Sequence, residues 1–281
     1  PSSPPSSTGR PSRAALRRQT FARDETATVR PRVRAYSFVD TSSRPSPPPS
    51  VPRIESLAAL SVYLGFTLLA LRPILHLGAS HIAPDPYDPV FNLTLLEWGI
   101  ARWKVGLAGF WNAPFFYPSQ GATAFSDHLL ELSAVGTVLR AFGFGPAAIY
   151  NTLLVAALTL SAWTAGYVLR RLGIGFFPAL LGGAIYSFAP FRWDQASHLQ
   201  ILWAPWVPLV LWSFDRLLER PSARRAASFL ALYALHLLGG SYLAYMIHFP
   251  LAAILFVRWR AQRAESSPTS PRRPRPALLV A

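Results

Sequence analysis

The chain has 281 residues, of which 51% are hydrophobic and only 14% are charged, and its apolar residues are gathered in long blocks. That distribution is typical of an integral membrane protein rather than a soluble domain. The formal net charge is +14, but the Arg residues lie in tails and short loops without interleaved aromatic residues, so we expect no nucleic-acid partner. The absence of cysteine excludes disulfides, thiol nucleophiles and Cys-ligated zinc.

The two ends of the chain differ in composition from its middle. Residues 1–53 are mainly Pro, Ser and Arg, which bury too little apolar surface to offset chain entropy, so a disordered basic tail is expected. Residues 258–276 have a similar composition and are expected to form a basic cytoplasmic loop. Residues 277–281 resemble the first turn of a further helix, and we interpret the sequence as a fragment.

Six apolar segments in residues 54–257 are expected to form a transmembrane domain. The first has about the ~20 residues that a helix needs to cross a bilayer core. The last two are separated only by Gly239-Gly240-Ser241, so one long helix is an alternative to two passes. The segments are Ser56 to Leu75, Gly145 to Leu169, Ile174 to Pro190, Leu199 to Phe214, Ala226 to Gly239 and Ser241 to Val257.

The distribution of basic residues favours two passes. One side of the membrane then receives ten Arg of the tail, two at 170–171, four in the loop at 215–225 and six in the loop at 258–275. These are 22 of the 27 Lys and Arg, and the positive-inside rule places them in the cytoplasm together with the N-terminus. The sequence therefore predicts an all-α fold, a polytopic transmembrane helical bundle.

This topology leaves a long outer loop at residues 76–144. Two stretches in it, Val90 to Val105 and Asp127 to Phe142, have helical spacing. The first suits a helix in the membrane interface because large apolar residues, Trp and Arg recur at intervals of three and four. Those residues are Phe91, Leu95, Trp98 and Arg102. A re-entrant or shallow spanning helix is an alternative for the second stretch, and every later segment would invert if this stretch truly spanned the membrane.

Two carboxylates, Asp85 and Asp88, stand among three prolines where the first apolar run emerges into water. An acidic residue at the membrane surface is a candidate general base for an incoming hydroxyl. The alternative is that Asp88 only caps the helix that begins after Pro89. The pair also leaves open a divalent cation as a cofactor.

The second outer loop contains Arg192, His198 and Gln200, with Arg192 and His198 at the ends of two apolar segments. Arg binds phosphate in a bidentate manner and His can hold a proton, so these residues would suit a lipid-phosphate leaving group. The alternative is that both side chains only reach to lipid headgroups.

A third polar pair, Asp127-His128, precedes the second helical stretch of the outer loop. The pair is a candidate for binding substrate or a divalent cation, although capping of the following helix is the favoured interpretation.

Four motifs together resemble bacterial multi-pass proteins of the GT-C glycosyltransferase superfamily. They run from Asp88 to Trp98, over Phe115-Phe-Tyr-Pro118, from Phe125 to Leu130, and from Tyr186 through Arg192 to Gln200. The resemblance covers roughly Ser56 to Val257. It implies transfer of a sugar from a polyprenyl-phosphate donor to an acceptor at the outer face of a bacterial inner membrane, with inversion at the anomeric carbon.

In that family an Asp of the first outer loop acts as base or positions the acceptor, and Asp88 matches that position better than Asp85. The chain departs from members with a paired acidic motif, since Pro86 separates its two acids. A lipid or solute transporter and a non-catalytic membrane assembly protein are the alternative functions.

Overall fold

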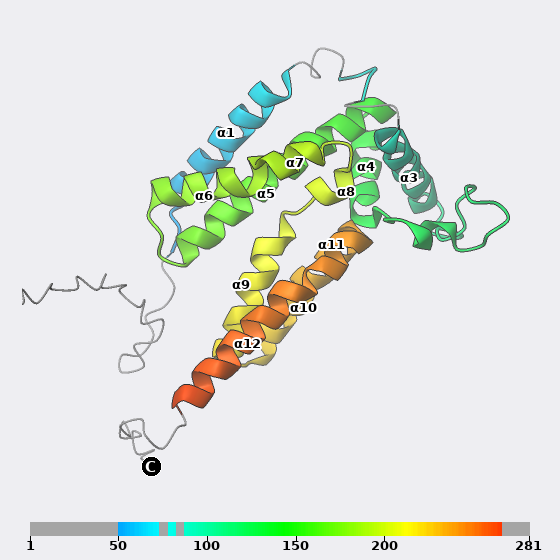
Figure 1. Ribbon diagram of the computed structural model, residues 1–281. Helices are drawn as coiled ribbons and strands as arrows, with labels where there is room; N and C mark the ends of the chain where they lie inside the picture. The colour runs from blue at the N-terminus through cyan, green and yellow to red at the C-terminus, as the bar shows by residue number, and fades with distance from the viewer. Residues whose placement is uncertain (1–49, 73–77, 83–86, 266–281) are drawn as a thin grey trace, which may run out of the picture. The chain divides into compact units, whose positions relative to one another are not determined.

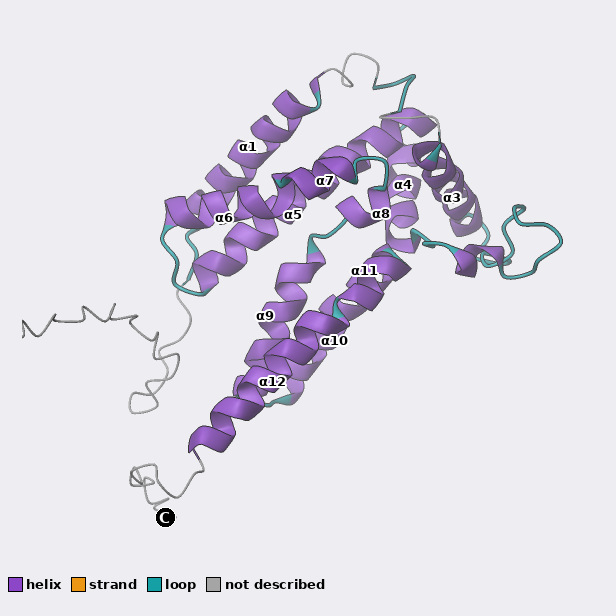
Figure 2. Cartoon of the chain, viewed as in Figure 1, coloured by secondary structure: helices purple, strands orange, loops and turns teal. Residues whose placement is uncertain are grey.

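The computed structural model describes residues 50–72, 78–82 and 87–265, and every regular element in that part of the chain is a helix (Figure 2). The chain divides into two units, Pro1–Pro47 and Pro48–Ala281, and the described residues all belong to the second unit. Most of the expected basic tail and residues 277–281 lie outside the described part. The all-α prediction is confirmed for the described residues.

Among the residues that the structure describes, three helical stretches are long and apolar enough to cross a membrane. They are α1 (Arg53–Ala70), α5 (Pro146–Arg171) and the stretch Ser241–Arg263. In α5, 61% of the apolar window is buried inside the protein, against 11% in each of the other two. α5 is therefore the central helix, and the other two expose apolar side chains of the kind that a bilayer covers.

The beginning of α1 lies beside the end of α5, so the two helices are antiparallel (Figure 1). Arg170 Nη2 lies 2.7 Å from Glu55 Oε2, and the Trp163 indole donates a 3.2 Å hydrogen bond to the Ser56 carbonyl oxygen. If both helices cross the bilayer, residues 71–145 emerge at the end opposite to Arg170.

Small residues bring α6 (Phe176–Phe188) close to α5. A Cβ atom on Gly183 would lie 2.4 Å from the Ala162 carbonyl oxygen and 2.3 Å from the Tyr63 hydroxyl, so only glycine fits. That hydroxyl donates a 2.8 Å hydrogen bond to the Leu180 carbonyl, which adds α1 to the contact. Small residues that allow backbones to approach are the usual means of packing membrane helices.

The third and fourth apolar segments form shorter helices than a full crossing needs. α6 has 13 residues, and Pro190 begins a separate helix, α7 (Pro190–Asp194). The segment from Leu199 is divided into α8 (Leu199–Leu202) and α9 (Trp206–Glu219), with Pro205 at the N-cap of α9. Proline removes a helical hydrogen bond and disfavours helix at the residue before it, which explains both interruptions.

The last two apolar segments are not one long helix. α10 (Ala223–Gly239) and α11 (Ser241–Met246) are separated by Gly240, whose φ of 171° and ψ of 153° are those of extended backbone. The chain then continues as α12 (His248–Glu265). The prediction that a loop begins at residue 258 is therefore wrong, because α12 continues through the first Arg residues of that stretch.

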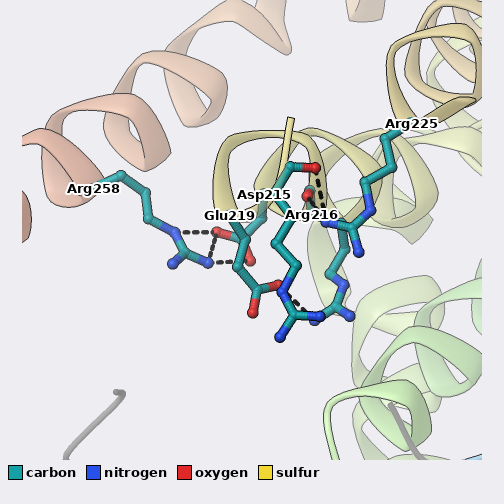
Figure 3. Close-up of polar contacts among 6 residues, drawn as sticks. Asp215, Arg216, Glu219, Arg225 and Arg258 are labelled. Atoms are coloured by element: carbon teal, nitrogen blue, oxygen red, sulfur yellow. Dashed lines mark hydrogen bonds and ion pairs between the residues drawn. The ribbon is translucent and has the colours of Figure 1, made fainter. Parts of the chain in front are cut away.

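An ion-pair cluster joins α12 to its neighbours at the point where the loop was expected (Figure 3). The Arg258 guanidinium of α12 donates two 2.7 Å hydrogen bonds to the two carboxylate oxygens of Asp215 in α9. Arg225 of α10 donates to the carbonyl oxygens of Arg216 and Arg220, each at 2.9 Å, at the C-terminal end of α9. These contacts join α9, α10 and α12 at one end.

The outer loop contains the two expected helices, α3 (Asp88–Trp103) and α4 (Leu130–Ala141), and a short 3-10 helix, Ala122–Phe125. The 12 residues of α4 reach about 18 Å, so this helix, like α6, is shorter than a bilayer core of about 30 Å, and the spanning alternative for it stays a prediction. Both helices pack on the first half of α5 through fully buried side chains that include Leu96, Leu132 and Ile149.

Replacing Gly183 by Ala is expected to destabilise the protein by about 1–3 kcal/mol because the new methyl group meets a backbone carbonyl of α5. Thermal unfolding of the purified chain in detergent measures this. Gly65→Ala in α1 is the matched control, because a Cβ there meets nothing within 4 Å. Equal melting temperatures for the two variants would contradict the close α5–α6 packing.

Candidate functional site

Asp88 is the first residue of α3, and Pro89 follows it in the first turn, where proline suits a helix start. The N-cap residue is Tyr87, and the helix start has no side-chain cap hydrogen bond. Helix capping therefore does not account for the Asp88 carboxylate, whose side chain is 56% exposed. The carboxylate is open to solvent and has its contact elsewhere.

That contact is His198, whose Nε2 atom lies 3.1 Å from Asp88 Oδ2. One helical turn further along α3, the buried Asn92 donates a 3.2 Å hydrogen bond from Nδ2 to the Ser197 carbonyl oxygen. Residues four apart share one face of a helix. The same face of α3 therefore holds the segment before α8 at two points, and the two outer loops converge on one site.

The imidazole of His198 has one unused nitrogen. Its Nδ1 atom is buried and has no hydrogen-bond partner among the described residues. When Nε2 carries the proton that faces Asp88, Nδ1 carries a lone pair. Because Nδ1 is buried, the 56% exposed carboxylate of Asp88 is the basic group of the pair that a substrate could reach, and a carboxylate can take a proton from a hydroxyl.

Arg192 lies in α7 and is only 8% exposed. Its Nη1 and Nη2 atoms donate hydrogen bonds of 2.8 Å and 2.6 Å to the carbonyl oxygens of Ile201 and Leu202, at the end of α8. The guanidinium thus satisfies carbonyl groups that a helix end leaves free. Its Nε atom is buried without a partner among the described residues, so the phosphate-binding role of Arg192 stays a prediction.

Asp127 and Gln200 both lie next to the break at Gly240. Asp127 Oδ1 accepts a 2.9 Å hydrogen bond from the Tyr242 amide, and a Cβ on Gly240 would lie 3.0 Å from the same oxygen. That Cβ would lie 3.4 Å from the Gln200 Cβ. Asp127 therefore binds the start of α11 and not the start of α4, which corrects the expectation that it caps the helix following it in sequence.

Glu131 of α4 accepts hydrogen bonds from two indoles. Trp203 Nε1 lies 2.9 Å from Oε2, and Trp206 Nε1 lies 2.9 Å from Oε1. These residues connect α4 to the link between α8 and α9, so the two ends of α8 are both tied to the outer-loop helices. Burial raises the pKa of Glu131 above its ordinary value, and the two indole hydrogen bonds oppose that rise.

His128 precedes α4 and accepts a 3.2 Å hydrogen bond at Nδ1 from the Leu130 amide. Its ring lies edge-on to the Trp111 ring, with 6.0 Å between centroids. Burial lowers the pKa of this imidazole, and the neighbouring Asp127 carboxylate partly offsets the effect. A neutral imidazole that accepts a backbone hydrogen bond supports the capping interpretation for this residue.

The described part of the chain offers no cluster of ligands for a divalent cation. Those residues contain no group of three or more His, Asp or Glu that could hold a metal ion. Asp85, the second expected acid, lies outside the described residues. A cation shared by Asp85 and Asp88 therefore stays a prediction.

Asn92 and Glu131 are the residues of this region that the sequence did not single out. Asn92 is the first residue of an Asn-Leu-Thr sequence. Its spacing of four from Asp88, which puts both residues on one helix face, was the signal that could have identified it. Glu131 was a lone acid in an otherwise apolar stretch, next to Leu129, Leu130 and Leu132. Its partners come from residues more than seventy positions away, which local patterns do not reveal.

Known proteins do not identify the chain. No protein-family model matches it, and neither a curated protein nor a solved structure shows significant similarity.

Arg192→Lys is expected to lower the melting temperature by several degrees, because one ammonium group cannot bond both carbonyls that the planar guanidinium reaches. Thermal unfolding in detergent measures the effect, with the exposed Arg224→Lys on α10 as the control. Unchanged stability of Arg192→Lys would contradict the role of this side chain at the end of α8.

The raised pKa of Glu131 predicts a pH-dependent stability. The folded protein favours the protonated carboxyl, so this contribution is fully present below the ordinary value of 4.5 and is lost as the pH rises through the higher folded value. As the pH rises above 4.5, the melting temperature of the parent should therefore fall relative to that of Glu131→Gln. A difference between the two proteins that stays constant over this range would contradict the prediction.

Proposed function

We propose that this chain belongs to a polytopic GT-C-type glycosyltransferase that moves a sugar from a polyprenyl-phosphate donor to an acceptor at the outer face of the membrane. The contact between Asp88 and His198 is the observation that carries the proposal. It joins two loops that are far apart in sequence, and both belong to the motifs on which the family resemblance rests.

The antiparallel contact of α1 and α5 supports the placement of this site outside the cell. Residues 71–145 lie between two helices that are each able to cross a membrane, and Arg170 and Arg171 lie at the opposite end of α5. The positive-inside rule assigns that basic end to the cytoplasm. A full bundle also requires the shorter helices α6, α9 and α10 to cross, and this crossing is part of the proposal. Local bilayer thinning and snorkelling of flanking residues accommodate short helices.

The proposed reaction is a single displacement. The oxygen of an acceptor hydroxyl attacks the anomeric carbon of the sugar, and the bond from that carbon to the phosphate oxygen breaks. The electron pair leaves with the polyprenyl phosphate, and the hydroxyl proton passes to the carboxylate of Asp88. A positioned general base contributes about 10²–10⁴-fold to such a step.

His198 orients that base. Its Nε2–H group, in the tautomer that donates to Asp88, holds one carboxylate oxygen and leaves the other facing solvent. Asn92 fixes the backbone just before His198 and thereby its position. The hypothesis also includes a supporting acid and three substrate contacts for which no observed contact gives support. The supporting acid is Asp85, and the substrate contacts are Gln200, Asp127 and His128.

A transporter is the second candidate, because the break at Gly240 resembles the interrupted helices at which transporters bind substrates. In transporters the free amides at such a break face the substrate. Here the Tyr242 amide is already bonded to Asp127 of the same chain. The enzyme is therefore favoured, and a non-catalytic assembly protein with this fold would show neither transfer nor transport.

Transfer of radiolabelled sugar from polyprenyl-phosphate hexoses and pentoses, measured in membranes that contain the full protein, tests the assignment. Asp88→Asn keeps the size of the side chain and is expected to lose at least about 100-fold in rate. His198→Gln is expected to show a smaller loss because the carboxylate is retained.

Asp194→Asn is the matched control, because Asp194 is an exposed carboxylate of the second outer loop whose hydrogen-bond partner is the neighbouring Gln195. It should transfer sugar at the parental rate. Full activity of Asp88→Asn together with loss of activity in Asp85→Asn would overturn the assignment of Asp88 as the base.

A further inference from the structure

The outer loop exposes a group of aromatic side chains to which the proposed chemistry gives no role. They lie in residues 104–126, between α3 and α4, a stretch that Figure 2 shows mostly as loop. We call this segment the aromatic loop. Its exposed rings are Trp111 (50%), Phe116 (54%), Tyr117 (94%) and Phe125 (66%).

The kind of exposed side chain differs between the aromatic loop and the long apolar helices. In α1 six of the seven large exposed apolar residues are aliphatic, and Phe66 is the exception. In the aromatic loop four of the five are aromatic, and Val105 is the exception. Aliphatic side chains suit the hydrocarbon core, whereas Trp and Tyr gather at headgroup depth, where a ring has one apolar and one wet side.

Charge on the end of α3 and on the aromatic loop is complementary to a lipid surface. From Trp98 to Ser126 the only charged residues are Arg102 and Lys104, and no acid occurs. The Arg102 guanidinium lies 4.2 Å from the centre of the Trp98 ring, an arrangement that holds a cation beside an interfacial ring. An anionic headgroup layer attracts such a segment, whereas an acid would be repelled.

The Phe116 ring is held in a fixed position by its neighbours. Phe116 has a φ of 58°, a left-handed conformation that is uncommon for a residue with a side chain. Its ring packs on Phe115 and on Phe91 of α3, with centroid distances of 5.3 Å and 6.3 Å, although it remains more than half exposed. A fixed, strained, exposed ring is a reason to look for a binding surface.

Chain connectivity puts the aromatic loop within reach of the bilayer. It lies in the connection between α1 and α5, and both ends of that connection are at the same membrane surface if the two helices cross. The helices on either side of it, α3 and α4, pack on the beginning of α5 through Ile100, Leu132 and Ile149, so the loop is tied to a membrane-crossing helix.

We propose that the aromatic loop is a membrane-docking surface that inserts Trp111, Phe116, Tyr117 and Phe125 into the outer leaflet interface beside α3. Docking there holds the beginning of α3, and with it Asp88 and His198, at the level of the lipid headgroups. The proposal depends on the crossing of α1 and α5 but not on sugar transfer, so it stands or fails separately from the enzymatic assignment.

Spin-label depth measurements test this directly, because the chain has no native cysteine to remove. Tyr117→Cys and Phe125→Cys variants of the full chain are labelled with a nitroxide in nanodiscs of phosphatidylethanolamine and phosphatidylglycerol. The nitroxide should collide more often with oxygen, which dissolves in lipid, than with a water-soluble nickel chelate. The ratio of the two collision rates should place the label at a depth of about 5–10 Å in the bilayer. Circular dichroism of each labelled variant confirms that it folds as the parent does.

Two control positions calibrate the scale. Ala223→Cys at the exposed beginning of α10 reports water, and Leu57→Cys on the exposed face of α1 reports hydrocarbon. The proposal would be overturned if the nickel chelate collided with the labels at Tyr117 and Phe125 as often as with the label at Ala223. Labels shielded from both reagents would also overturn it, because a second copy of the chain or another protein would then cover the loop.

Discussion

The buried guanidinium of Arg192 donates hydrogen bonds to the last two carbonyl groups of α8, and the position of the candidate site depends on this interaction. α8 has only four residues, too few for a helix to be stable by itself. Arg192 holds its last two carbonyl groups, Leu199 and Leu202 anchor it in the core, and His198 before it contacts Asp88. A cation placed among hydrogen-bond acceptors in a buried site is strongly bound to them, so this end of the segment is fixed.

Much of the fold could be predicted from the sequence because hydrophobic blocks report burial and membrane contact directly. The helical stretch beginning near Val90 and the long segment from Gly145 correspond closely to α3 and α5. The divided segment at α8 and α9 was missed although Pro205 marks it, because a long apolar run outweighed the local effect of one proline. The extension of α12 beyond residue 257 was missed because the Arg-rich composition there was read as a loop, and the ion pair of Arg258 with the distant Asp215 is a contact that composition does not reveal.

The candidate site was predictable only in part for the same reason. Asp88 and His198 each stood at an apolar segment boundary, but their 3.1 Å contact depends on how α3 packs against the residues before α8. Arg192 was a natural phosphate ligand by residue type, and the structure instead uses both its terminal nitrogens on carbonyl groups. A residue type indicates what chemistry is available, whereas the fold decides which partner uses it.

The proposed enzyme combines a fixed short helix, an acid and imidazole pair and a membrane surface, and its central requirement is that one sugar donor binds at that pair. A cryo-electron microscopy structure of the full protein in nanodiscs with a bound polyprenyl-phosphate sugar tests this most directly. We expect the sugar within hydrogen-bonding reach of the Asp88 carboxylate, with His198 still in contact with it. A donor bound elsewhere, or Asp88 and His198 separated from each other when the donor is bound, would contradict this function for the site.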